Sequence, residues 1–329
     1  MKGGFRRGIL WGMIVVLLLA LGACEREEAT VVVDLSKRER LEAPVRPFDL
    51  TYAYLPQYTH EVSFQRHHDL VVYLQKQTGL RVRQVYPDTF DDHMTMVHKG
   101  RIDISFVNPF VYVKMADAGD ARAFARIEEP EITIGSTKDG VAWWQLPGRA
   151  HFRGQVIVRG NDSRFARLED CRGKRWIAVD HSSAGGYLYP LGLFYEHGIT
   201  AADFAEIAFS PGPGGKQEKV VMAVLAGRYD LGSIREGTLD VMKGIIADGA
   251  VRVLAHTKWY PGWVYAARTG LEPSIVDAVR QALLALEPTN PADRKILEMA
   301  GFLRVIVATD ADYKPIRRLI EEIGPLNMP

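Results

Sequence analysis

Strand-like and helix-like apolar runs alternate along most of this 329-residue chain, and this alternation restricts the fold more than any other feature. A helix-like run over 64–77 is followed by a strand-like run over 81–86, and the order resumes at 175–179 and 187–197. Such alternation is typical of α/β proteins, in which helices cover mainly parallel strands. We therefore predict mainly parallel sheets flanked by helices.

Two segments far apart in the chain resemble each other. Residues 97–105 and 224–232 each contain a helix end, a Gly-Arg pair and an apolar-Asp-apolar strand. Internal similarity of this kind is expected from two lobes of similar build. We place one lobe at 48–150 together with 260–329, and the other at 151–259.

The N-terminus has the features of a bacterial export signal. Three basic residues precede an apolar run over 9–20, which is too short and wrongly flanked for a membrane span. The sequence Leu-Gly-Ala before Cys24 resembles a lipobox. We predict a lipoprotein signal peptide over 1–23 and lipidation of Cys24. The alternative is an ordinary secretory signal with a chance cysteine.

Charge and cysteine content describe the exported chain. Residues 24–47 are charged without periodicity and read as a tether. Three of the 41 Lys and Arg residues lie in the signal, so 38 remain against 40 Asp and Glu, a formal net charge of −2. We therefore expect no nucleic-acid partner. Once Cys24 is lipidated, Cys171 has no disulfide partner in the chain, and we predict that it is a small buried hydrophobe.

Ligands of α/β proteins bind beyond the carboxyl ends of the strands, and in a two-lobed protein they bind between two such edges. In the first lobe these positions hold Tyr54, Gln57, Asn108 and Phe110. Tyr54 alternatively belongs to the core, and Gln57 is then merely exposed. Asn108 is suited to cap the next helix, because Pro109 fits the first helical position. Phe110 is a candidate wall of the pocket.

In the second lobe a turn rich in hydroxyls and glycine opens a helix. The first amides of a helix lack internal partners and carry partial positive charge, and glycine lets an anion approach them. The alternative is a plain helix cap without a ligand. The candidate residues of this turn are Ser182, Ser183, Gly185, Gly186 and Tyr187.

Two further loops of the second lobe contribute candidates. Gln217 follows the glycine-rich stretch 211–215, and its amide can hydrogen-bond a ligand. Arg235 is a charged fork suited to an oxyanion, and Glu236 can compensate it or receive a cationic group. The alternative for Arg235 and Glu236 is an exposed ion pair at a helix start.

The turn resembles the Ser-Thr-Ser-Gly-Tyr motif of the periplasmic phosphate/phosphite/phosphonate-binding proteins of ABC importers, and the resemblance covers nearly all of the chain after residue 45. Ser183 keeps the first hydroxyl, whereas Ala184 and Gly185 replace the threonine and the second serine. Members of that family often have a histidine at Gln217 and an aromatic residue at Phe152. The resemblance implies a two-lobed, Venus-flytrap fold of the periplasmic-binding-protein type.

It also implies a function. We expect an extracytoplasmic lipoprotein, monomeric and anchored to a bacterial membrane, that delivers a small oxyanion such as phosphate, phosphite or phosphonate to an ABC permease by hinge closure. The same fold also serves sensor subunits that present a ligand to a membrane histidine kinase. A third alternative is a hydrolase that uses Ser182 or Ser183, with His181 adjacent. Because the common hydrolase, phosphate-loop and zinc-protease motifs are absent, we predict no catalysis, metal or cofactor.

Overall fold

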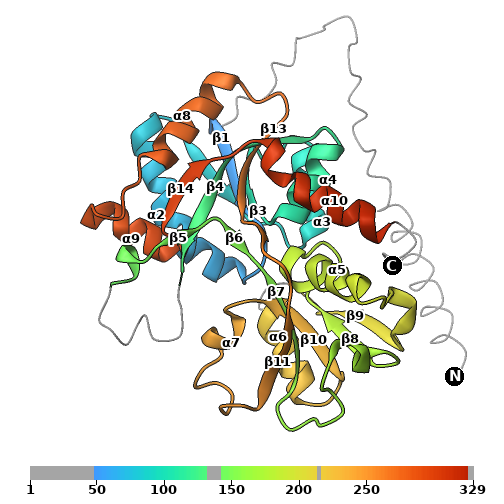
Figure 1. The fold of residues 1–329 in the computed structure, drawn as a ribbon. Coiled ribbons are helices and arrows are strands. Elements are labelled where there is room, and N and C mark those ends of the chain that lie inside the picture. The colour runs from blue at the N-terminus through green and yellow to red at the C-terminus, as the bar shows by residue number, and fades with distance from the viewer. Residues whose placement is uncertain (1–47, 132–141, 213–215, 325–329) are drawn as a thin grey trace, which may run out of the picture. The chain divides into compact units, whose positions relative to one another are not determined.

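The computed structural model describes residues 48–131, 142–212 and 216–324 (Figure 1). The predicted signal peptide, Cys24 and the whole predicted tether lie outside these residues, as do 213–215 of the glycine-rich loop. No helix within the described ranges has the length and apolar character that a membrane span needs.

One sheet has seven strands in the order β14-β4-β13-β3-β1-β2, with β5 paired to β4. Its strands are β1 (Leu50–Tyr54), β2 (Val82–Val85), β3 (Ile104–Val107), β4 (Ala121–Pro130), β5 (Gly148–Arg149), β13 (Val264–Arg268) and β14 (Arg304–Val307). The helices between and after these strands are α2 (His60–Thr78), α3 (Phe90–His98), α4 (Pro109–Asp117), α8 (Pro273–Leu284), α9 (Pro291–Ala300) and α10 (Lys314–Ile323). The chain thus returns to this sheet after a long excursion.

The excursion forms a five-stranded sheet in the order β11-β7-β10-β8-β9. Its strands are β7 (Gly154–Arg159), β8 (Arg175–Ala178), β9 (Glu206–Phe209), β10 (Leu231–Arg235) and β11 (Val251–His256). Its helices are α5 (Tyr189–Glu196), α6 (Lys216–Leu225) and α7 (Thr238–Val241). A short ribbon of β6 (His151–Phe152) and β12 (Tyr260–Pro261) joins the two segments that cross between the sheets.

Both sheets are mixed, which corrects the prediction of mainly parallel sheets. β1 is parallel to β2 and β3, and β8 is parallel to β9 and β10. β13 is antiparallel to β3, and β7 is antiparallel to β10. The physical reason lies in the two crossings between the sheets. The chain enters β7 and β13 directly from the other sheet, and no helix first carries it to the far end of the new sheet. A chain that leaves one carboxyl edge and enters the facing one must run in reverse.

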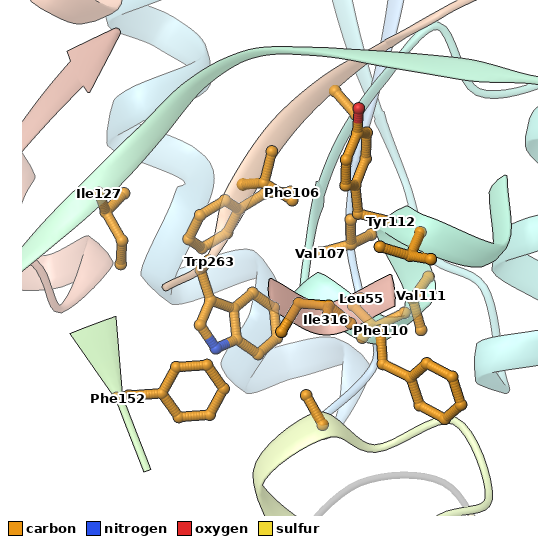
Figure 2. Close-up of a cluster of buried hydrophobic side chains, with 14 of the residues drawn as sticks. Leu55, Phe106, Val107, Phe110, Val111, Tyr112, Ile127, Phe152, Trp263 and Ile316 are labelled. Carbon is orange, nitrogen blue, oxygen red and sulfur yellow. The ribbon is translucent and has the colours of Figure 1, made fainter. Parts of the chain in front are cut away.

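Aromatic side chains fill part of the core where the chain crosses between the two sheets. Trp263 lies between Phe106 and Phe152 in Figure 2, and its ring centroid is 5.2 Å from that of Phe106. Cys171 is also fully buried, as predicted, and burial raises the pKa of its thiol to about 12. The thiol therefore packs as an uncharged apolar group.

Candidate functional site

Residues that follow strands of both sheets surround one narrow pocket with an accessible volume of about 10 Å³, which we call the inter-sheet pocket. Its lining residues are Gln57, Asn108, Phe152, Ser183, Ala184, Gly185, Gln217, Arg235 and Trp263. Six of the twelve sequence-predicted candidates are therefore brought together here. The other six do not line the pocket.

The loop after β1 contributes Gln57. Its amide nitrogen donates a hydrogen bond to the Tyr54 hydroxyl at 3.3 Å. The Tyr54 ring packs against Phe106 and Trp263, and only 6% of the residue is exposed. Of the two readings for Tyr54, the structure favours the core residue, which holds Gln57 in place without lining the pocket.

Asn108 caps α4, as its sequence position predicts. Its Oδ1 accepts from the amides of Phe110 and Val111 at 2.9 and 3.0 Å, and its Nδ2 donates to the Ser182 carbonyl at 3.2 Å. These two α4 amides are therefore occupied by the cap and are not free for an anion. The buried Phe110 ring does not line the pocket and instead contacts the Lys114 ammonium, 4.5 Å from its centroid.

The turn between β8 and α5 supplies free backbone donors. Ser183 caps a π-helical turn, Ala184–Leu188, that continues into α5, and its Oγ accepts from the Gly186 amide at 3.2 Å. The amides of Ser182 and Ser183 donate to Asp180. Among the described residues, the amides of Ala184 and Gly185 have no hydrogen-bond partner. Two unpaired N–H groups at a helix start, facing a pocket, are suited to bind an anion.

The two glycines of the turn have different roles. A Cβ on Gly185 would lie 2.8 Å from Cε2 of Phe152, so the residue lets the pocket wall approach the turn. A Cβ on Gly186 would lie 2.3 Å from Cγ2 of Val179, which is a core contact. Gly186 therefore serves packing beneath the pocket rather than its lining.

Ser182 and Tyr187 also support the turn from outside the pocket. The Ser182 hydroxyl accepts from the Lys114 ammonium at 2.9 Å. The Tyr187 ring is buried against Trp176 and Phe209. Both side chains thus fix the turn against its neighbours.

Arg235 places a guanidinium at the pocket. The Gln217 Oε1 accepts from the Arg235 main-chain amide at 2.9 Å, which ties α6 to the end of β10. The guanidinium donates to both carboxylate oxygens of Glu129, at the end of β4. Burial is the largest single effect and lowers the pKa of Arg235, but the charge and hydrogen bonds of Glu129, together with Tyr58 and Tyr54, outweigh it, so the pKa lies above its ordinary value.

Glu236, the neighbour of Arg235, is directed away from the pocket. Its carboxylate accepts from Nε and Nη2 of Arg153 at 2.8 and 2.6 Å, and Arg149 lies 3.7 Å from it. The prediction that Glu236 compensates Arg235 is therefore wrong: Glu129 has that role. Successive side chains along a strand point to opposite faces, so Glu236 is directed to the opposite side from Arg235 at the end of β10.

Sequence reasoning missed Trp263 and Glu129. Trp263 precedes β13, where the chain re-enters the first sheet, and Glu129 lies near the end of β4. The signal for Glu129 was its place near the carboxyl end of a strand. That signal required the full length of β4, which runs to Pro130.

The serines lack the arrangement of a hydrolase nucleophile. His181 pairs with Asp91 at 3.3 Å and Asp180 at 3.5 Å, and within the described residues no histidine is hydrogen-bonded to Ser182 or Ser183. Among the described residues, no group of three or more His, Cys, Asp or Glu side chains is arranged to hold a metal ion.

Comparisons with known proteins identify relatives of this architecture. A family model described as "ABC transporter, phosphonate, periplasmic substrate-binding protein" matches residues 52–313. The phosphate-import protein PhnD of Mycolicibacterium smegmatis is 25% identical over 321 residues, which cover 92% of this chain and 94% of that protein.

Solved structures share the fold. PhnD1 from Prochlorococcus marinus, in complex with methylphosphonate, has a TM-score of 0.68 at 17% identity over 82% of this chain and 96% of that chain. A binding protein component of an ABC phosphonate transporter from Pseudomonas aeruginosa has a TM-score of 0.67 at 16% identity, over 82% and 84%. The fold is therefore the α/β periplasmic-binding-protein fold, as predicted. Because the family model spans most of its length, the chain belongs to the periplasmic substrate-binding proteins of phosphonate ABC transporters.

Proposed function

We propose that this protein captures a small oxyanion of the phosphate, phosphite or phosphonate class in the inter-sheet pocket and delivers it to an ABC permease. The observation that carries the proposal is that Ala184 and Gly185 line the pocket at the start of a helix, and that their amides have no hydrogen-bond partner in the part of the chain that the structure describes. Backbone donors in this position stabilise negative charge without needing the hydroxyls that the turn has lost. The protein acts as a carrier and not as an enzyme.

Ligand capture is coupled to hinge closure in this proposal. The pocket takes Gln57 and Asn108 from the first sheet, and Ser183 and Gln217 from the second. A ligand that contacts both groups favours the closed arrangement over an open one. The family model and the curated relative are described as transport components, which supports import rather than presentation to a histidine kinase.

Titration calorimetry with phosphate, phosphite, methylphosphonate and sulfate tests the ligand class. The decisive variant is Ala184→Pro, which deletes one of the two free amides. Proline is tolerated at this first helical position, because the extended Ser183 backbone (φ −80°, ψ 126°) suits a following proline. The chain itself begins α4, α8 and α9 with proline.

We expect Ala184→Pro to remain folded and to lose at least about tenfold in affinity, the scale of one charge-assisted hydrogen bond. The control is His60→Pro, which places proline at the first position of α2, away from the pocket. Unchanged affinity in Ala184→Pro contradicts the site. Failure of every oxyanion to bind the wild-type protein contradicts the function.

Small-angle scattering tests the closure. With a saturating oxyanion identified by calorimetry, the radius of gyration should fall relative to the free protein, because the crossing segments that contain β6 and β12 bend. Ala184→Pro at the same anion concentration serves as the unliganded control. An equal radius with and without ligand in the wild-type protein argues against closure on binding.

We also propose that Cys24 is lipidated and anchors the protein to a bacterial membrane. Cys24→Ser should move the protein from the membrane fraction to the soluble extracytoplasmic fraction, since attached acyl chains supply the anchoring energy. The control is Cys171→Ser, which keeps the lipobox. Soluble wild-type protein cleaved at another site rules out the anchor.

A further inference from the structure

An anion that belongs to the protein already binds the charged residue of the inter-sheet pocket. Arg235 is the single charged residue among the described residues that line the pocket, and Glu129 binds its guanidinium from the opposite sheet. One nitrogen, Nη2, donates to both carboxylate oxygens. Each side chain is 24% exposed, so water screens the pair less than it screens a surface ion pair.

The contact uses the same donors that an oxyanion would need. A carboxylate and a phosphate or phosphonate both present paired oxygens, and an arginine fork recognises either group. With Glu129 in place, the charge of Arg235 is compensated before any ligand arrives. We propose that Glu129 is an internal ligand of the pocket, which competes with the transported oxyanion for Arg235 and thereby sets the affinity of the site.

Arg235 remains positioned when its partner leaves. Its main-chain amide is held by Gln217, and its guanidinium carbon lies 5.1 Å from the centroid of the Phe152 ring. Its Nε is buried and has no hydrogen-bond partner among the described residues. The guanidinium thus has a spare donor and an aromatic contact, and the Arg235 main chain is fixed independently of Glu129, so an oxyanion can exchange for the carboxylate without rearranging the pocket wall.

The proposal rests on the proposed function, and it predicts a gain of affinity from the loss of a charge. Glu129→Gln keeps the shape of the side chain but removes its negative charge, so the competition weakens. Phosphate affinity, measured by calorimetry at fixed ionic strength, should rise about tenfold, which corresponds to about 1.4 kcal/mol. If Glu129 instead served only to orient Arg235 for the ligand, the same change would lower the affinity.

Glu128→Gln is the matched control. Glu128 precedes Glu129 on β4 and pairs with Arg304 at 3.1 Å, outside the pocket. The Glu128→Gln variant removes the same charge from the same strand, so its phosphate affinity reports any general electrostatic effect. The double variant Glu129→Gln with Arg235→Gln should lose the gain, because the gain requires the released guanidinium.

Four outcomes decide the question. A gain confined to Glu129→Gln supports the internal ligand, including the case in which the wild-type protein binds phosphate too weakly to measure. Binding by the wild-type protein with no gain in Glu129→Gln overturns it and leaves the proposed function intact. An equal gain in Glu128→Gln also overturns it. Failure of the wild-type protein and all variants to bind any tested oxyanion overturns the proposed function and the internal ligand together.

Discussion

At the scale of single residues, the lack of a side chain at Gly185 determines the shape of the pocket. The Phe152 ring and the Arg235 backbone both approach the position where a Cβ would stand, the former to 2.8 Å and the latter to 3.6 Å. Any larger residue must displace the ring or enter the pocket. Glycine is therefore required here by close approach and not by its backbone conformation, which has no positive φ.

Gly185→Val should consequently abolish most of the oxyanion affinity, with a loss of at least tenfold in calorimetry. The fold should survive at a cost of about 1–3 kcal/mol, the usual penalty for an overpacked site. Gly185→Ala adds a single methyl group, so its oxyanion affinity and its stability should lie between those of the wild-type protein and Gly185→Val. Wild-type affinity in a folded Gly185→Val protein would show that the turn is only a helix cap.

At the scale of elements, the C-terminal helix α10 packs against both parts of the molecule. It lies against α4, which follows a strand of the seven-stranded sheet, and against α5, which follows a strand of the five-stranded one (Figure 1). Buried Leu319 of α10 approaches Gly192 of α5 so closely that a Cβ there would lie 2.4 Å from Leu319 Cδ1. The contact leaves no room for a methyl group between the two helices.

Gly192→Ala should destabilise the protein, whereas replacing a helical glycine by alanine usually stabilises it. Alanine in place of a helical glycine normally stabilises by about 1 kcal/mol. Here the collision with Leu319 should make the variant less stable by about 1–3 kcal/mol in urea unfolding. The double variant Gly192→Ala with Leu319→Ala should be more stable than the sum of the two single effects predicts. Stabilisation by Gly192→Ala alone would refute this helix contact.

At the scale of the whole molecule, two buried histidines tie stability to pH. His67 contacts the Tyr52 hydroxyl at 2.8 Å, and His93 contacts the Ser105 hydroxyl at 2.8 Å. Neither residue is exposed, and burial lowers the pKa of each imidazole to about 3. Folding therefore requires both rings to be neutral.

The sign of the pH effect follows from linkage. In the unfolded chain a histidine titrates near pH 6.5, whereas the folded protein keeps both rings neutral down to about pH 3. The contribution of the two neutral rings to the free energy of unfolding is thus fully present above pH 6.5. It is lost as the pH falls toward 3, because only the unfolded state takes up protons. Between pH 7 and 5 each ring should remove about 2 kcal/mol from the free energy of unfolding.

Urea unfolding at several pH values checks this expectation. His93→Gln should be less stable at pH 7, but its stability should fall less between pH 7 and 5, since one titrating ring is gone. His68→Gln, at an exposed position beside His67, should retain the wild-type slope. An identical slope in His93→Gln and the wild-type protein would show that His93 is not held neutral. Asp162, whose pKa the Arg164 hydrogen bond lowers to about 2, titrates below this window.

The fold class, the family and the second-lobe residues Ser183, Gly185, Gln217 and Arg235 of the inter-sheet pocket could be predicted from local sequence patterns. Alternating apolar periods report strands and helices, and the chemistry of caps and turns is local. For this reason Asn108 could be recognised as a cap, and the turn of Ser182, Ser183 and Gly185 as a helix start with room for close approach, from a few neighbouring residues.

Tertiary structure alone decided which side chains share the pocket. Arg235 and Glu129 are 106 positions apart, and they meet because β4 and β10 end at facing sheet edges. Trp263 joins them only after the chain crosses back to the first sheet. The same crossings reverse β7 and β13, which no local pattern encodes, since apolar periodicity is equal in either strand direction. Strand direction and the pairing of distant charges depend on where the whole chain passes between the sheets.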